Sequence, residues 1–317
     1  MTVNAGAHLP QLSLYLTTYS ENDLGGWQTV LERARIAERA GFDRLVVPDH
    51  VVFGEQLEEY ARPEVGGAAG GRQPTGPDGH WLEPLTVLSV VAGITSSIRL
   101  GTNILIAALR RPVVLAKTLS TLDVLSNGRV DLGVGVGWQR EEYQAAGLAF
   151  EGRGRLLDHT LDVCQTLWRE PRAAFDSPLL HFEKIHMMPK PRQPGGVPIW
   201  VSGTVNNNVI RRVARFGSGW IPWGPDRLDV VTGIAKMREG LVGLGRDPSS
   251  LDVVGVLPLL TDQHGAVDLA RTMECVPALA AAGVTDFRVN TTFPDDQGQT
   301  TDILTALAES FRVARTG

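Results

Sequence analysis

The feature of this sequence that most constrains its fold is a repeated alternation of apolar runs with amphipathic stretches. The apolar runs are short, turn residues bound them, and eight can be counted along the 317 residues. This alternation is typical of βα units that build a parallel sheet. The predicted strands are Leu12–Leu16, Asp43–Val47, Ile98–Ile106, Val130–Val136, Pro198–Ser202, Gly219–Pro222, Leu251–Leu260 and Val284–Asn290.

Eight βα units fit either a closed barrel or an open, doubly wound sheet. The doubly wound sheet requires a glycine-rich phosphate turn directly after its first strand, and residues 17–21 offer none. We therefore predict an α/β fold, a single (β/α)₈ TIM barrel over residues 1–317. Helix-spaced apolar residues near Trp27 and Phe311 predict that the first and last helices are neighbours in the ring.

Two segments interrupt the alternation. Residues 171–197, after the fourth unit, are rich in proline and have no helical period, which predicts an irregular excursion from the barrel. Residues 62–79, after the second strand, are dense in glycine and proline. They follow a strand at the face where barrel enzymes keep their chemistry, so they form either a lid or an insertion without a role.

Composition excludes several classes of partner. The net charge is −5 with interspersed signs, so no basic stripe favours nucleic acid. No uncharged apolar run approaches the roughly 18 residues of a membrane span. Residues 1–10 have neither a basic nor an apolar targeting region, and we therefore expect a cytoplasmic protein.

Asp49 and His50 follow the second predicted strand, where a barrel places reactive side chains. A histidine titrates near neutrality, and a neighbouring aspartate can orient its ring or hold its charge. The alternative is that Asp49 caps a turn and His50 is an ordinary surface residue. The position favours function without excluding that alternative.

Small residues end the fourth and fifth predicted strands. Gly133, Gly135 and Gly137 are two apart and share one side of the strand, which opens the backbone to a flat or bulky group or relieves crowding in the barrel. Residues 202–204 precede a helix start at residues 206–208, which suits either a phosphate or an ordinary asparagine N-cap.

The sequence lacks the motifs of zinc, serine-nucleophile and lysine Schiff-base chemistry. No histidine has the spacing of a zinc site, and no serine elbow occurs. The four lysines lie in predicted helices or in the excursion rather than on strands. We therefore expect no metal and no covalent lysine intermediate.

In combination, several blocks resemble the bacterial luciferase-like family, specifically its branch that uses the deazaflavin coenzyme F420. The blocks are residues 42–50, 100–104, 119–129, 137–143, 188–191, 198–203 and 219–224, so the resemblance covers nearly the whole chain. It implies a barrel with an insertion after the fourth βα unit, a small-molecule substrate and a homodimer.

The same resemblance implies a site at the carboxyl ends of the strands. It maps a non-proline cis peptide to Asn103–Ile104, against the cofactor ring. It puts the cofactor phosphate near two groups of residues, Gly135, Val136 and Gly137, and Ser202, Gly203 and Thr204. His50 is implied near the reactive face of the ring, with Asp49 behind it.

One position departs from the family pattern. Trp138 stands where the sugar-phosphate dehydrogenases of this branch carry an acidic glutamate. The acid–base partner is therefore sought in His50, in Glu141 or Glu142, or in the substrate itself, and Glu141 is the candidate we add to His50 and Asp49.

The resemblance implies an F420-dependent oxidoreductase that transfers a hydride between the deazaflavin and a small organic substrate. Arginine far outnumbers lysine, and alanine and glycine are abundant, which indicates a GC-rich genome and favours F420. Two alternatives stay open. One is an FMN-dependent monooxygenase on the same fold, and the other is a non-catalytic flavin-binding barrel.

Overall fold

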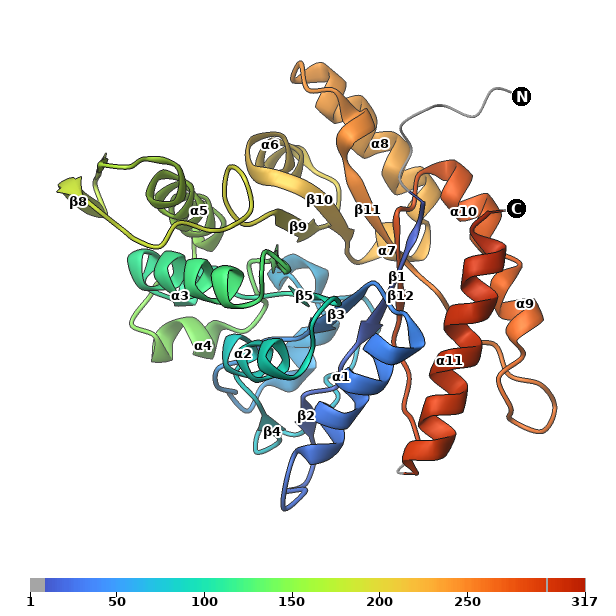
Figure 1. Ribbon diagram of the computed structural model, residues 1–317. Coiled ribbons are helices and arrows are strands. Elements are labelled where there is room, and N and C mark those ends of the chain that lie inside the picture. Colours follow the sequence, from blue (N-terminus) through green and yellow to red (C-terminus); the bar gives the residue numbers. More distant parts are fainter. Residues whose placement is uncertain (1–8, 295, 317) are drawn as a thin grey trace.

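Parallel strands and helices alternate along the chain in the computed structural model, which describes residues 9–294 and 296–316 (Figure 1). Within these residues eight parallel strands close into a barrel in the order β1-β12-β11-β10-β9-β6-β5-β3. The strands are β1 (Gln11–Tyr15), β3 (Arg44–Val47), β5 (Arg99–Thr102), β6 (Val130–Val134), β9 (Ile199–Gly203), β10 (Gly217–Pro222), β11 (Asp252–Val256) and β12 (Asp286–Val289). The predicted (β/α)₈ barrel is confirmed.

Helices surround the barrel. They are α1 (Gln28–Ala40), α2 (Pro84–Ile94), α3 (Pro112–Leu125), α4 (Arg140–Ala145), α5 (Arg153–Arg169), α6 (Asn207–Phe216), α7 (Pro225–Leu228), α8 (Val230–Gly243), α9 (Leu269–Met273), α10 (Val276–Ala282) and α11 (Gln297–Ala314). Helices α1 and α11 pack side by side, and Arg312 of α11 donates to the carbonyl of Ala40 at 2.9 Å. The predicted contact between the first and last helices is therefore confirmed (Figure 1).

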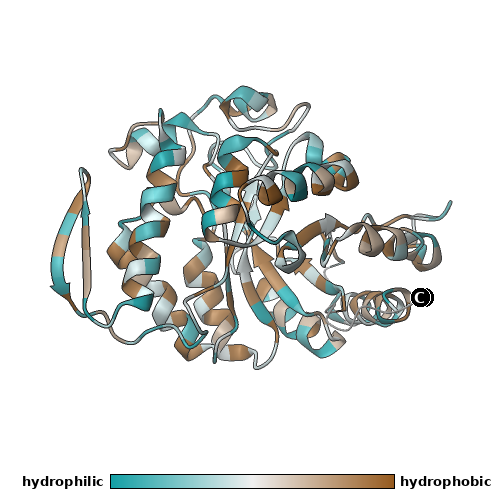
Figure 2. Cartoon of the chain, turned by 90° about the horizontal axis from the view of Figure 1, so that it is seen from above, coloured by the Kyte–Doolittle hydropathy of each residue, from teal (hydrophilic) through white to brown (hydrophobic). Residues whose placement is uncertain are grey.

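The main hydrophobic core lies between the strands and the helices, as the hydropathy colouring of Figure 2 illustrates. The inside of the barrel differs, because charged side chains occupy part of it. Arg44 pairs with Asp131 at 2.8 Å and with Asp286 at 3.0 Å, and Arg288 pairs with Asp286 at 2.9 Å. These four side chains are almost fully buried, so each charge needs its partner.

Three strands end two or more residues before their predicted carboxyl ends. Strand β5 ends at Thr102 rather than Ile106, because a cis peptide follows and residues 107–109 form a 3₁₀ turn. Strand β6 ends at Val134, two residues early, where the glycine run reaches the end of the ladder. Strand β11 ends at Val256 rather than Leu260, and Pro258 in that interval lacks the N–H that a ladder needs.

The prediction of an irregular excursion over residues 171–197 is wrong in one respect. Its first half forms an antiparallel hairpin of β7 (Ala173–Ser177) and β8 (Leu180–Ile185). Phe175 and Phe182 stack across the hairpin with centroids 5.9 Å apart. The hairpin follows α5 and precedes β9, so the predicted insertion after the fourth unit is present, and it projects from the body in both ribbon views (Figures 1 and 2).

Residues 62–79 contain one short regular element and otherwise form turns and bends, and short elements flank them on both sides. A 3₁₀ turn spans Leu57–Ala61 and another spans Pro63–Val65. The segment ends at β4 (His80–Trp81), which pairs antiparallel with β2 (Tyr19–Ser20). It therefore connects the loops that follow the first and second barrel strands.

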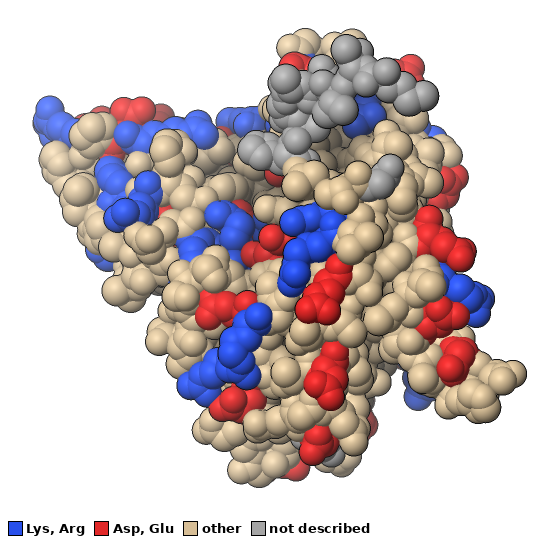
Figure 3. Space-filling model, turned by 45° about the vertical axis from the view of Figure 1, so that its right-hand side comes forward, with Lys and Arg blue, Asp and Glu red and all other residues tan. Residues whose placement is uncertain are grey.

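No helix in the described residues is long and apolar enough to cross a membrane. Lys, Arg, Asp and Glu side chains are interspersed on the face shown in Figure 3. Of residues 1–10, on which the expectation of a cytoplasmic protein rests, residues 1–8 lie outside the part that the structure describes.

Candidate active site

His50 lies just past the carboxyl end of β3, at the mouth of the barrel, and its side chain is 10% exposed. Its Nδ1 lies 3.1 Å from Oε2 of Glu142, whose side chain is fully buried. The other Glu142 oxygen accepts the Val51 N–H at 2.7 Å. Because the carboxylate accepts at Nδ1, the ring is fixed and its Nε2 is free of hydrogen-bond partners among the described residues.

Glu142 is thus the orienting carboxylate, and the sequence placed it only as one option among several. Glu141, the candidate added to His50 and Asp49, lies against Gly54 instead, because a Cβ at Gly54 would clash with the Glu141 side chain. Both residues start α4, and consecutive helical residues point in different directions. Only the packing of α4 on the loop after β3 distinguishes them.

Asp49 has its hydrogen-bond partners elsewhere, and none of its partners among the described residues is His50. Its carboxylate accepts hydrogen bonds from both terminal nitrogens of Arg110. It also accepts one from the Ile106 N–H, at 2.8 Å. Burial raises the pKa of the Asp49 carboxyl, and the Arg110 guanidinium and the Ile106 N–H oppose that rise. This carboxylate ties the loop after β3 to the segment after β5. The catalytic role expected for Asp49 behind His50 stays a prediction.

The peptide bond between Asn103 and Ile104 is cis, as the resemblance predicts. The Asn103 side-chain oxygen accepts from Nη1 of Arg288 at 2.7 Å, which links the mouth to the charged interior of the barrel. The Ile104 side chain packs with Trp200, Ile221 and Val254 in a small apolar cluster of its own. This cluster is an apolar floor beneath the mouth.

The glycines of β6 and of the residues just after it leave room for β5 and the residues that follow β5. A Cβ at Gly135 would lie 2.8 Å from Cδ1 of Ile104, and one at Gly137 would lie 3.2 Å from Ile106. At Gly133 it would collide with the Thr102 carbonyl. The glycines relieve crowding inside the barrel, which was one of the two predicted explanations. Gly137 also adopts φ +67°, which favours glycine.

Helix α6 begins with an ordinary N-cap. Asn206 accepts the N–H groups of Asn208 and Val209, and Asp226 accepts the Val205 N–H at 2.6 Å. These N–H groups are therefore not available to a phosphate. The cofactor role expected for Ser202, Gly203 and Thr204, like that of Gly135, Val136 and Gly137, stays a prediction.

Aromatic side chains enclose His50. Its ring centroid lies 4.5 Å from that of Phe53, 5.0 Å from Trp81 and 5.9 Å from Trp138. Tyr60 contacts Trp138 at 5.4 Å and thereby brings the segment after β3 onto the site. Of these side chains, sequence reasoning singled out His50 and, for its departure from the family pattern, Trp138, and it gave no signal for Phe53 or Tyr60.

Several buried polar atoms near the mouth have no hydrogen-bond partner in the described residues. They include Nε1 of Trp138 and Nε2 of both Gln73 and Gln139. Each orphaned buried donor costs about 1–3 kcal/mol. Together with the apolar floor at Ile104, the two glutamine donors fit a flat ring with acceptor atoms on its edge, such as a flavin or a deazaflavin.

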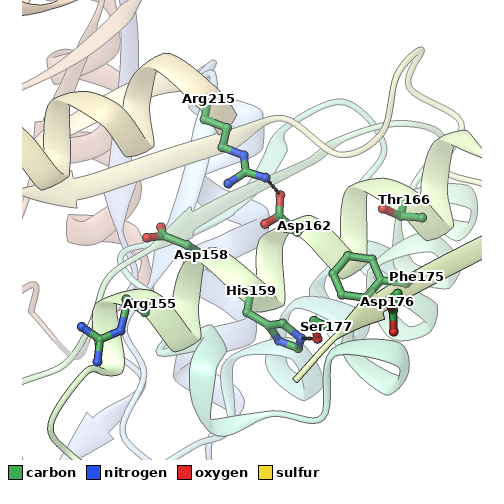
Figure 4. Close-up of a pocket in the computed structure, with 9 residues that line it drawn as sticks. All are labelled: Arg155, Asp158, His159, Asp162, Thr166, Phe175, Asp176, Ser177 and Arg215. Carbon is green, nitrogen blue, oxygen red and sulfur yellow. Dashed lines mark hydrogen bonds and ion pairs between the residues drawn. The ribbon is translucent and has the colours of Figure 1, made fainter. Parts of the chain in front are cut away.

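A separate surface pocket of about 540 Å³ lies between α5, β7 and the end of α6 (Figure 4). Asp162 pairs there with Arg215 at 2.6 Å, and His159 meets Ser177 at 3.0 Å. Ser177 also accepts the N–H groups of the hairpin turn, which makes it a turn residue.

In the described residues no cluster of His, Cys, Asp and Glu could hold a metal ion.

Comparison with known proteins identifies the family. The family profile of luciferase-like monooxygenases matches residues 8–274. The chain belongs to this family. An uncharacterised protein of Mycobacterium tuberculosis is 31% identical to this luciferase-like chain over 217 residues, which are 68% of this chain and 74% of that protein.

Among named relatives, the F420-dependent glucose-6-phosphate dehydrogenase of Kineococcus radiotolerans is 32% identical over 206 residues, 63% of this chain and 60% of that protein. An F420-dependent secondary alcohol dehydrogenase solved with an F420–acetone adduct superposes with a TM-score of 0.74 at 18% identity, covering 96% of this chain and 100% of the other. A monooxygenase from Streptomyces bottropensis superposes with a TM-score of 0.72 at 18% identity, covering 96% and 99%. At such identities the two structures show the shared fold.

Proposed function

We propose that this luciferase-like chain is a coenzyme F420-dependent oxidoreductase that transfers a hydride between the deazaflavin and a small organic substrate, in the cytoplasm. The observation that carries the proposal is the arrangement at the mouth. There the imidazole of His50, fixed by Glu142 and free at Nε2, stands beside an apolar floor and unpaired buried donors. The named F420-dependent relatives support the choice of cofactor.

A bound deazaflavin would supply the hydride donor or acceptor, and the chain would do the rest. Hydride transfer to a carbonyl or from an alcohol leaves a proton to be given or taken at oxygen. Nε2 of His50 is the group placed to exchange it, because Glu142 holds Nδ1. Phe53, Trp81 and Trp138 surround the imidazole and limit its exposure to water.

An FMN-dependent monooxygenase is the second candidate, favoured by the family match itself. Calorimetric titration of the purified protein with oxidised F420, and separately with FMN, separates the two. We expect F420 to bind more tightly. Preference for FMN would make the monooxygenase the leading reading, and binding of neither would leave a non-catalytic barrel.

We also propose that the protein is a homodimer that pairs through α2 and α3. Apolar side chains on these helices are exposed, among them Val90 at 45%, Val114 at 63% and Leu125 at 76%. Exposed apolar patches of this kind mark protein interfaces. Light scattering of the eluting protein tests it: a dimer mass is expected, and a Val114→Glu, Leu125→Glu variant should elute as a monomer.

A further inference from the structure

We infer that the indole N–H of Trp138 binds the substrate, and that the substrate is an apolar molecule with a neutral acceptor oxygen, a carbonyl or a hydroxyl. The inference rests on the proposed function for its chemistry. It deepens that function by naming a substrate-binding residue and a class of substrate.

The first observation is the missing partner of Trp138. The side chain is 4% exposed and its Nε1 has no acceptor in the described residues. Four other indoles of the chain do donate: those of Trp81, Trp168, Trp220 and Trp223. Buried donors without partners are rare in native proteins, so an acceptor from outside the chain explains this one.

The second observation is where the orphaned donor lies. Trp138 follows Gly137 just beyond β6, and its ring meets the His50 ring edge to face, with centroids 5.9 Å apart and planes at 74°. An indole donates one hydrogen bond and accepts none. A substrate oxygen held by Trp138 would therefore lie in the same aromatic enclosure as the free Nε2 of His50.

The charges around Trp138 decide the class of substrate. Arg110 is held by Asp49 and by Glu83 at 3.1 Å. Arg153 donates to the carbonyls of Gly137 and Val65 and lies over the ring of Phe150. These two guanidinium groups are already engaged. A further cation, Arg227 of α7, is exposed and its charge acts on Tyr60, whereas the described contacts of the Trp138–His50 pair include no guanidinium or ammonium group. A neutral oxygen on an apolar body fits this enclosure better than a sugar phosphate does.

Access to the N–H requires the segment of residues 57–67 to move. Tyr60 packs on the Trp138 ring, and a Cβ at Gly66 would lie 3.7 Å from the Trp138 Cα. Trp223 fastens the same segment by donating to the carbonyls of Gly66 and Gly67, each at 3.1 Å. Residues 57–67 are therefore held over Trp138 by a few contacts, which can break when a substrate binds.

The direct test observes the indole N–H groups by NMR in the full-length protein labelled with ¹⁵N-tryptophan and loaded with F420. A Trp138→Phe variant assigns the Trp138 signal, and cyclohexanone is the probe. We expect a downfield shift of this signal with cyclohexanone and none with methylenecyclohexane, which has the same shape and no oxygen. The Trp168 signal, already bonded to Ala116, should not move.

A kinetic arm separates this inference from the proposed function. With reduced F420 and cyclohexanone, Trp138→Phe should raise KM by about two- to tenfold, the loss of one neutral hydrogen bond, with unchanged F420 affinity. Trp168→Phe is the matched control. If the signal shifts but the wild type transfers no hydride, the proposed function fails and the role of Trp138 stands. If cyclohexanone and acetophenone both leave the Trp138 signal in place, the inference is overturned.

Discussion

At the scale of single residues, the site depends on which carboxylate meets which nitrogen. His50 is anchored through Nδ1 by Glu142, and Asp49 is anchored to Arg110. The neighbouring residues Asp49 and His50 therefore have different roles. Asp49 holds two loops together, and His50 faces the enclosure. Substitutions at the two positions should accordingly change different properties, turnover at His50 and stability at Asp49.

Replacing His50 by alanine should lower kcat by about 10²- to 10⁴-fold, the usual contribution of a positioned acid–base group. Affinity for F420 should stay within about threefold, because the floor at Ile104 and the unpaired donors remain. Steady-state kinetics and calorimetric titration measure the two quantities. Unchanged turnover in His50→Ala would remove the role assigned to this side chain.

Replacing Asp49 by asparagine should act on stability. The change leaves the Arg110 guanidinium without its buried counter-charge, and breaking a buried pair costs about 3–5 kcal/mol. Denaturant unfolding measures the loss, and His50→Ala serves as the comparison because it breaks no pair with Arg110. A stable Asp49→Asn protein that is inactive would instead favour a direct role in catalysis.

At the scale of elements, the site is completed by the segment of residues 57–67. Its Tyr60 packs on Trp138 beyond β6, and Trp223 beyond β10 donates to two of its carbonyls. Segments held by few buried contacts open more readily than the barrel they cover. The glycine-rich composition of residues 62–79 suggested a lid. We propose that this lid is held closed by the hydrogen bonds from Trp223 to the carbonyls of Gly66 and Gly67.

Trp223→Phe should loosen that fastening without unfolding the barrel. Loss of the indole donor should speed hydrogen exchange in residues 57–67 by about tenfold, which corresponds to one hydrogen bond. Exchange followed by mass spectrometry resolves this segment, and the β7–β8 hairpin is the internal control. Equal acceleration in both regions would indicate general destabilisation instead of a fastening.

At the scale of the whole molecule, charges inside the barrel set its response to acid. Burial alone would raise the pKa of Asp131, but Arg44 and Arg99 overcome this, and the pKa of the Asp131 carboxyl lies below its ordinary value. A group with a lowered folded pKa contributes stability above its unfolded pKa, about 3.9 for aspartate, and loses it as the pH falls through the folded value.

Asp131→Asn should therefore reduce the free energy of unfolding at pH 7 by about 3–5 kcal/mol, because two arginines lose their buried partner. As the pH falls below about 4 the gap between the variant and the wild type should begin to narrow, and it should close only below the folded pKa of Asp131, where acid removes the same charge from the wild type. Urea unfolding at pH 7 and pH 3 measures both differences. Glu274→Gln, at an exposed position, controls for the loss of a carboxylate, and a constant gap between wild type and Asp131→Asn would contradict the assignment.

By itself the sequence determined the features that depend on local periodicity. Alternating apolar runs specified the strands of the barrel, and the position of His50 after one of them indicated the end of the barrel at which the candidate site is proposed. Resemblance added the cis peptide at Asn103–Ile104. These features could be predicted because each depends on residues close together in the chain.

Tertiary structure alone decided the partnerships between distant segments. Glu142 is 92 residues from His50, and nothing local distinguishes it from Glu141 as the partner of that ring. The Arg110 bond to Asp49, the hairpin of β7 and β8, and the unpaired N–H of Trp138 are likewise outcomes of packing. Side-chain partners at a barrel mouth come from different βα loops, and sequence periodicity carries no information on how those loops meet.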